Sequence, residues 1–468
     1  MQRGNWPSSI MALLMLTPST AFLSAQKYPE RPVFKLLRYE EDWSQFRNAG
    51  ARTEWVDSLK YIPLSRREGW YLSLGGEVRE LMEYFDHPSW GREPADNKYL
   101  LQRYMLHTDL RFGSRVRFFG QLKSGIETNR KGGPRPADED LLDVHQAFVD
   151  ATVWQSAANS VTLRVGRQEM EFGSSRIISA REGPNVRQSF DGVRLAFTFR
   201  GWQLDTFSLK PAETSRWIFD DSPDHTRSFW GAYGVRPFPG LPKAKVDLYY
   251  LGLDRKRGRY DAGLGREQRH SLGARLWGAG GSWDYNYEGL FQGGRFSSGG
   301  IRAWTIASDS GYRLEGVKWR PRFGVKADIA SGDQNPDDKT LGTFNALFPK
   351  GSYFSEADLL GPYNLMDVHP SVQFNLTQSL RLTADGAFFF RQSTRDGIYG
   401  IAGNLLESGR GVAARYIGSH ARAQMEWTIN RHMSFSTTYL HFFPADFLRQ
   451  AGPNRAVNFV GTRLSYRL

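Results

Sequence analysis

The sequence predicts an all-β protein: a transmembrane antiparallel β-barrel of about 18 strands, with short periplasmic turns and long extracellular loops. Three observations lead to this prediction. Segments that alternate apolar and polar residues follow one another from Trp70 to the C-terminus. The connections between these segments alternate between short and long. Residues 457–468 form a closing strand with one apolar and one polar face.

The strands are identified by their period-two alternation. Residues 103–112 place Tyr104 and Leu106 on an apolar face, and after a Gly-Ser turn at 113–114 the same alternation continues in 115–127. This pattern is typical of a β-hairpin. Strands are expected at 70–79, 103–112, 115–127, 143–154, 160–168, 191–200, 202–209, 228–236, 243–252, 269–277, 280–292, 301–307, 318–330, 369–378, 380–392, 413–429, 432–443 and 457–468.

The connections favour a barrel over other β folds. A soluble sandwich or propeller has no reason to alternate short and long connections, and the chain shows no fixed repeat period. Short connections are expected at 113–114, 201, 237–242, 278–279, 378–379 and 430–431. Long connections are expected at 81–102, 128–142, 169–190, 210–227, 253–268, 331–368, 393–412 and 444–455.

The last strand carries a terminal pattern of its own. Leu464, Tyr466 and Leu468 alternate with Arg463, Ser465 and Arg467, so one face suits lipid and the other suits water. The pattern resembles the C-terminal assembly signal of bacterial outer-membrane barrels. Those barrels usually end in Phe, and Leu468 departs from that rule.

Composition narrows the class of protein further. A mean hydropathy of −0.51 excludes a bundle of transmembrane helices, although a barrel with a polar lumen can have this value. The 48 Gly and the 14 Trp, 20 Tyr and 31 Phe suit tight turns and interfacial aromatic girdles. A net charge of +12 indicates anionic partners such as lipopolysaccharide or an acidic solute. We expect no nucleic-acid partner, because the charges lie in the predicted barrel.

The chain divides into three expected parts. Residues 1–25 read as a signal peptide, with a positive start, a short apolar run and small residues. Residues 26–69 form a polar N-terminal segment that is periplasmic or faces the lumen, and residues 70–468 form the barrel. The predicted location is therefore the outer membrane of a Gram-negative type of cell.

Arginine dominates the face of the strands that is opposite to the lipid face. Rings of Arg or Lys select anions in pores, and a guanidinium holds a carboxylate through two hydrogen bonds. We therefore expect an arginine-rich lumen that binds an anionic solute, in which carboxylates such as Glu77 and Asp191 orient arginines. The expected contacts to the solute are Arg79, Arg117, Arg164, Arg167, Arg194, Arg322, Arg463, Lys123 and Lys326. The long loops at 81–102 and 169–190 are expected to fold inward as gates.

One strand breaks the alternation. If the parity of Val161, Leu163 and Val165 continued, Arg167 would face lipid, where a charge is costly. We therefore expect a β-bulge at Gly166 that turns Arg167 into the lumen.

No catalytic or metal-binding constellation is visible in the sequence, so we expect no enzyme and no cofactor. The acidic stretch 331–338 lacks the EF-hand spacing and its closing Glu, and it is interpreted as a solvated turn.

The chain resembles the bacterial alginate-export outer-membrane porins from about Tyr39 to Leu468. Each matching motif is weakly specific, but their order and spacing together are more specific. The motifs are residues 39–43, 59–64, 74–79, 166–168, 189–194, 330–333 and 443–447. The resemblance implies a monomeric barrel that passes alginate, a uronic-acid polymer, outward by passive movement, with possible periplasmic export components as partners. Ser174 stands where an acidic residue is expected.

Two alternatives stay open at this stage. The first keeps the barrel and makes it an anion-selective porin for the uptake of small organic acids. The second is a secreted, soluble β-rich protein that binds polysaccharide, which would leave the mature chain in the periplasmic fraction.

Overall fold

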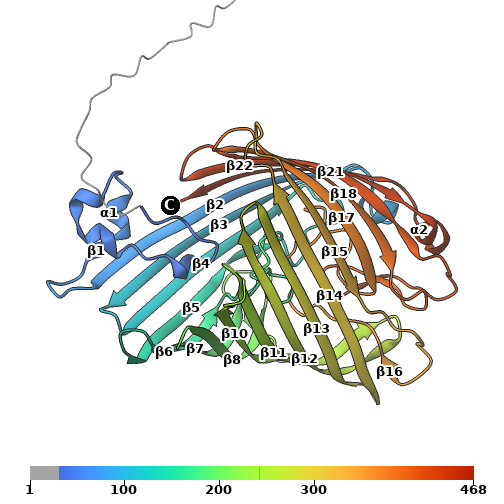
Figure 1. The fold of residues 1–468 in the computed structure, drawn as a ribbon, viewed down its shortest axis with the longest axis horizontal. Helices are drawn as coiled ribbons and strands as arrows, with labels where there is room; N and C mark the ends of the chain where they lie inside the picture. Colours follow the sequence, from blue (N-terminus) through green and yellow to red (C-terminus); the bar gives the residue numbers. More distant parts are fainter. Residues whose placement is uncertain (1–30, 242) are drawn as a thin grey trace, which may run out of the picture. The chain divides into compact units, whose positions relative to one another are not determined.

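The computed structural model describes residues 31–241 and 243–468, in which strands form one closed antiparallel barrel (Figure 1). Each strand pairs with the next along the chain, and the last strand, β23 (Val457–Arg467), pairs with β2 (Trp70–Phe85). The other barrel strands are β3 (Asn97–Phe112), β4 (Val116–Thr128), β5 (Asp140–Gln155), β6 (Ser160–Gln168), β7 (Phe190–Phe199), β8 (Trp202–Glu213), β10 (Arg227–Pro237), β11 (Lys245–Tyr260), β12 (Gly263–Gly280), β13 (Trp283–Phe296), β14 (Gly299–Arg313), β15 (Arg322–Ala330), β17 (Leu365–Asn375), β18 (Leu380–Arg391), β21 (Tyr416–Thr428) and β22 (Met433–Pro444).

Short elements lie outside the barrel wall. They are β1 (Ile62–Pro63), β9 (Ser222–Pro223), β16 (Thr340–Leu341), β19 (Ile398–Tyr399) and β20 (Leu405–Glu407), the helices α1 (Asp57–Lys60) and α2 (Asp446–Ala451), and 3-10 turns at Arg38–Glu40, Ser44–Arg47, Ala49–Ala51 and Pro88–Gly91. No helix in the described ranges has the length and apolar character to cross a membrane.

Each of the eighteen expected strands is present, and the fold prediction is confirmed. One expected long connection is wrong. Residues 253–268 are almost entirely strand, because β11 and β12 continue to a two-residue turn and Tyr260 pairs with Gly263. The loop expected at 81–102 is also shorter, since β2 runs to Phe85 and β3 begins at Asn97.

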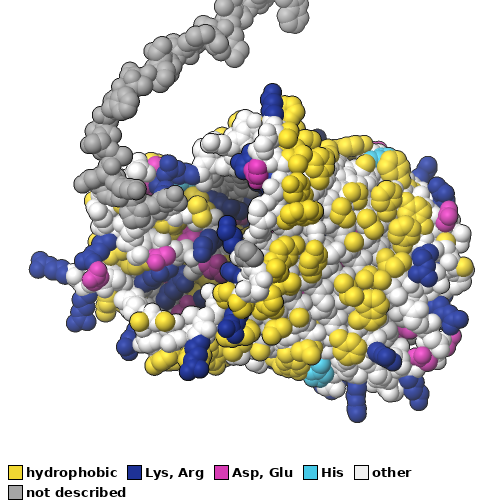
Figure 2. All heavy atoms as spheres, viewed as in Figure 1, with side chains coloured by type: hydrophobic (Ala, Val, Ile, Leu, Met, Phe, Trp, Pro, Cys, Tyr) yellow, Lys and Arg dark blue, Asp and Glu magenta, His cyan; other side chains and the backbone are white. Residues whose placement is uncertain are grey.

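The outer face of the wall carries an apolar belt. Leu272, Phe291 and Ile306 on three consecutive strands are 67, 54 and 57% exposed, whereas the inward residue Ala303 is fully buried. Figure 2 shows apolar side chains gathered over this face. The alternation therefore arises from two solvents, lipid outside and a polar, packed lumen inside.

The N-terminal segment from residue 32 to 69 lies at the end of the barrel that carries the short turns and the C-terminus (Figure 1). Strand β1 pairs with β2, and the buried Lys60 donates from Nζ to the carbonyl oxygen of Leu74 at 2.9 Å. Arg38 donates from Nη2 to the carbonyl oxygen of Leu468 at 2.8 Å. These contacts tie the segment to the seam where the barrel closes.

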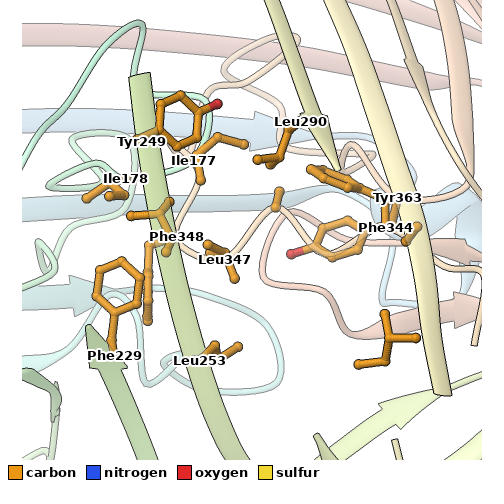
Figure 3. Close-up of a cluster of buried hydrophobic side chains, with 14 of the residues drawn as sticks. Ile177, Ile178, Phe229, Tyr249, Leu253, Leu290, Phe344, Leu347, Phe348 and Tyr363 are labelled. Atoms are coloured by element: carbon orange, nitrogen blue, oxygen red, sulfur yellow. The ribbon is translucent and has the colours of Figure 1, made fainter. Parts of the chain in front are cut away.

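Two long loops fold into the lumen. Residues 169–189, between β6 and β7, and residues 331–364, between β15 and β17, meet where Phe348 N donates to Ile177 O at 2.9 Å. Figure 3 shows Ile177, Ile178, Leu347 and Phe348 from these loops among wall residues such as Phe229. The apolar contacts fix both loops inside the barrel, where they narrow the passage.

The start of the second loop differs from its prediction. Ser331 and Asp333 are buried, and Asp333 N donates to Asp396 Oδ2 at 2.8 Å, so this part is packed and not a solvated turn. The later residues Gln334 and Asp338 have the exposure that the prediction expected.

Candidate functional site: the charged lumen

Most of the expected lumen cations are neutralised by a carboxylate across the sheet. Arg117 donates from Nε and Nη2 to Asp109 at 2.6 and 2.9 Å. Arg164 holds Asp150 in the same two-pronged way at 2.7 and 2.9 Å. Such paired bonds leave no net charge for a passing anion, although they stiffen the wall. Two further arginines follow the same rule, Arg194 with Asp205 and Arg322 with Asp284.

An aromatic side chain of the N-terminal segment covers part of this arginine wall. The ring centroid of Tyr39 lies 4.1 Å from the guanidinium of Arg164, which also stacks on Phe148 at 3.8 Å. Arg194 donates from Nη1 to the Tyr39 hydroxyl at 3.4 Å. These arginines therefore bind the N-terminal segment in addition to their carboxylates.

Lys123 on β4 and Arg167 on β6 belong to a second paired cluster. Lys123 Nζ lies 2.7 Å from both Asp140 and Asp221. Arg167 donates to both oxygens of Asp191 at 2.9 and 3.1 Å. The carboxylates of Asp140, Asp143 and Asp221 are close enough to share a metal ion. Lys123 already forms ion pairs with Asp140 and Asp221.

The bulge expected at Gly166 is wrong. The β6–β7 register is continuous, with Gly166 opposite Gly192 and Arg167 opposite Asp191. The two glycines instead have positive φ values of 130° and 148°, and a Cβ on Gly166 would lie 2.2 Å from a backbone oxygen. The register shift lies one strand away, in β5, where the carbonyl of Val144 accepts from Arg167 Nη1 at 3.1 Å. Asp191 and the carbonyl oxygen of Val144 stabilise the charge of Arg167, so no bulge is needed.

Arg79 holds a loop and does not face an open lumen. It is fully buried, and its two terminal nitrogens donate to the carbonyl oxygens of Glu182 and Pro184 at 2.7 and 3.0 Å. Arg103 reaches the carboxylate of Glu182 on the same loop. Arg79 thus fastens the first lumen loop to β2, and its expected contact with a solute stays a prediction.

Glu77, which was expected to orient arginines, lies beside the contacts that Arg79 and Arg103 make with the first lumen loop. It accepts hydrogen bonds from Arg103 at 2.7 Å and from Arg467 at 3.0 Å. Asp191, the other expected orienting residue, accepts both donors of Arg167. Their part in selecting a solute stays a prediction.

Arg463, Lys326, Arg181 and Lys350 are among the lumen cations that lack a carboxylate partner within salt-bridge distance in the described part of the chain. Arg463 on β23 and Lys326 on β15 were expected from the strand parity. Arg181 and Lys350 lie on the two lumen loops, and the sequence analysis missed them. The nearest described acceptor to Arg463 Nε is the Ser436 hydroxyl, at 3.4 Å.

One of these cations, Arg463, lies where both loops approach the wall. A cavity of about 50 Å³ is lined by Arg463, by Glu182 and Gly183 of the first loop, and by Ser352 and Glu356 of the second. Arg181 and Lys350 are each close in sequence to these lining residues. The lining also includes Glu83, and two of its three glutamates are paired, Glu182 with Arg103 and Glu356 with Arg422. Arg463 is the cation of this lining, and it lacks a carboxylate partner among the described residues, so it can attract an anion.

The titration of Lys350 gives this region a pH dependence. Burial, followed by the neighbouring cations Lys326 and Arg176, lowers the pKa of Lys350 to about 8. The lysine is charged below that pH and neutral above it.

We expect the preference for anions to fall as the pH rises through about 8. Replacing Lys350 with Gln removes this step, whereas replacing the exposed Lys318 with Gln leaves it in place. Reversal potentials measured across a salt gradient from about pH 6 to about pH 10 provide the readout. A step that persists unchanged in Lys350→Gln would contradict the assignment.

Solved structures share this barrel. The outer membrane protein OpdK from Pseudomonas aeruginosa has a TM-score of 0.57 and 13% identity, covering 85% of this chain and 98% of its own. The structure of Pseudomonas aeruginosa OccK2 (OpdF) in complex with glucuronate gives the same values. Acinetobacter baumannii OccAB2 has a TM-score of 0.57 and 12% identity, covering 84% and 98%. At these identities the likeness shows the fold alone. No curated protein matches the chain in sequence.

A family model provides the identification. The model described as alginate export matches residues 70–462, which is nearly the whole barrel. Together with the closed barrel and its apolar belt, the match makes this protein an outer-membrane channel. The chain belongs to the alginate export family.

Proposed function

We propose that the protein passes an anionic polysaccharide, an alginate-like uronate polymer, across the outer membrane by passive movement. The observation that carries this proposal is a set of lumen cations without a carboxylate partner among the described residues, Arg181, Lys326, Lys350 and Arg463, of which Arg463 lines the cavity beside the two loops. A polymer with one carboxylate per sugar can exchange one cation for the next as it moves. Binding at each position must be weak and repeated for such movement.

The chemistry of the cations fits uronate carboxylates. Arg463 and Arg181 each offer a planar donor fork, and Lys326 and Lys350 offer mobile point charges. The family description, alginate export, supports a polymer as the solute. The glucuronate complex of Pseudomonas aeruginosa OccK2 supports a uronate as the recognised unit.

A second candidate is the uptake of small organic acids. The specific observation in its favour is that residues 169–189 and 331–364 fold into the lumen and meet there, where Phe348 N donates to Ile177 O at 2.9 Å, so the loops narrow the passage for a sugar chain. A solved structure of Pseudomonas aeruginosa OpdK contains vanillate, a small aromatic acid. Both candidates use the same cations and differ in the length of the solute.

The outer face of the barrel indicates which molecules surround the channel. The apolar belt contacts lipid and lipopolysaccharide, and one chain closes its own barrel, so we propose a monomer that works with periplasmic export components. The soluble, secreted alternative is wrong, because the protein is an outer-membrane barrel with its apolar residues outside. Its fold and family are those of a channel rather than of an enzyme.

Efflux from liposomes tests the proposal. Liposomes that contain the refolded protein are loaded with uronate oligomers or with neutral oligosaccharides of equal length, and release is followed over time. We expect the uronates to leave faster. In Arg463→Gln their release should slow about fivefold, because one unit charge contributes about 1 kcal/mol in a hydrated passage.

The exposed Lys318→Gln removes the same charge outside the lumen and should release uronates at the wild-type rate. Release of uronate monomers but not of oligomers would select the small-acid candidate. Equal release of uronate and neutral sugars would contradict both candidates.

A further inference from the structure

Two histidines and an aspartate converge in the barrel wall, where Lys326 on β15 lies opposite His369. His369 on β17, Asp385 on β18 and His420 on β21 are 4, 9 and 4% exposed. His369 Nε2 lies 2.7 Å from Asp385 Oδ1, and His420 Nε2 lies 3.3 Å from the same oxygen. The three potential ligand atoms all lie within 4.8 Å of one another.

The backbone is shaped around this cluster. Pro370 lies in the middle of β17, where it cannot donate to the ladder and is normally disfavoured. The β17–β18 register runs from Val368 opposite Phe388 directly to Ser371 opposite Asp385, so the pairs of His369 and Pro370 are missing. The gap in the ladder lets His369 reach Asp385 across the sheet.

Neighbouring side chains fix the orientation of each group. Arg422 Nε donates to Asp385 Oδ2 at 2.8 Å, and Arg422 Nη1 donates to Glu356 Oε2 at 2.7 Å. The guanidinium thus occupies one carboxylate oxygen and leaves Oδ1 to the histidines. The rings of His369 and His420 meet edge to face at 5.2 Å, and Phe389 packs against His420. The groups around a metal ligand typically hold it in this way.

We propose that His369 Nε2, His420 Nε2 and Asp385 Oδ1 bind a divalent transition metal of the zinc class. Two imidazoles and one carboxylate suit zinc, whereas calcium and magnesium prefer oxygen ligands alone. Ligand atoms of a tetrahedral zinc site lie about 3.3 Å apart. The contact between His420 Nε2 and Asp385 Oδ1 has this separation, at 3.3 Å, and the contact between His369 Nε2 and the same oxygen is shorter, at 2.7 Å.

The bound metal acts as a cross-link between three strands. It joins β17, β18 and β21 at the point where Pro370 removes ladder hydrogen bonds, and water takes the fourth position. Because a ligand that binds only the folded state stabilises it, the metal raises the melting temperature of the barrel.

Metal binding to the refolded full chain in detergent tests this assignment. After treatment with a chelator, titration calorimetry with zinc alone should give one equivalent bound. His369→Gln and His420→Gln should each weaken that binding at least about tenfold. The matched control is His270→Gln, which changes a histidine on the outer face that bonds to Tyr250, and it should bind like the wild type.

Two readouts separate metal binding from misfolding. Cobalt should give the intense absorption of a tetrahedral site in the wild type, and zinc should raise the melting temperature of the wild type but not of His369→Gln. A weak octahedral spectrum, or zinc binding that is equal in all four proteins, would overturn the proposal. So would the absence of zinc binding by a folded wild type.

Discussion

Replacing Arg79 with alanine should raise the frequency of large-conductance openings about 100-fold in single-channel recordings. The wild-type side chain is fully buried and donates to the carbonyl oxygens of Glu182 and Pro184. Hydrogen bonds from a charged donor contribute about 1.5–3 kcal/mol each, so the lumen loop loses about 3 kcal/mol of attachment. A loss of that size shifts a closed loop toward its open state by two orders of magnitude.

Two variants distinguish this effect from a general loss of stability. Arg79→Lys keeps the charge but not the planar fork, and it should open more often than the wild type but less often than Arg79→Ala. Arg115→Ala changes an arginine in an exposed turn and should behave like the wild type. If Arg79→Ala keeps the wild-type openings in a normally folded barrel, the loop is not a gate held by Arg79.

The second large effect concerns the charge of the lumen. The triple variant Arg463→Gln, Lys326→Gln and Lys350→Gln should lower the permeability of anions relative to cations by on the order of 100-fold. Each of these charges lacks a partner and contributes about 1 kcal/mol to the attraction of an anion in a hydrated passage. The readout is the reversal potential across a salt gradient.

A matched control removes charges without changing the net charge of the lumen. Arg194 is bound to Asp205 at 2.8 Å, and Asp205 has no other cation within salt-bridge distance among the described residues, so Arg194→Gln combined with Asp205→Asn deletes one cation and one anion together. This pair of changes should leave the selectivity unchanged. If the paired deletion lowers the selectivity as much as the triple variant does, the distinction between paired and unpaired cations is wrong.

The strand order of the barrel could be predicted from the sequence, and for a physical reason. Lipid on one face and a polar lumen on the other impose a strict period of two, which Tyr104, Leu106 and their charged neighbours show directly. The tip of the β11–β12 hairpin was missed because it extends past the apolar belt. There, residues such as Lys256 and Arg257 are charged on both faces and the period is lost.

The candidate site was only partly predictable, because parity shows which way a residue points and not what it meets. Arg164 and Arg463 have the same inward parity, yet one is bound to Asp150 and the other has no carboxylate partner in the described chain. Arg181 and Lys350 lie on loops whose position in the lumen depends on apolar contacts such as Ile178 with Phe348. No local pattern in the sequence encodes those long-range contacts.

Gly166 shows the same limit at the level of the backbone. The sequence correctly marks Arg167 as a charge that needs partners, but it does not show that Asp191 lies directly opposite. The register places that carboxylate within reach, so the strand has no need of a bulge.

The most direct test is single-channel recording of the refolded protein in a planar bilayer, with uronate oligomers added to one side. The lumen cations that lack a carboxylate partner predict an anion-selective current that the oligomers block, and a weaker block in Arg463→Gln. A current that favours cations, or an anion current that uronate oligomers leave unchanged, would contradict the proposed uronate channel.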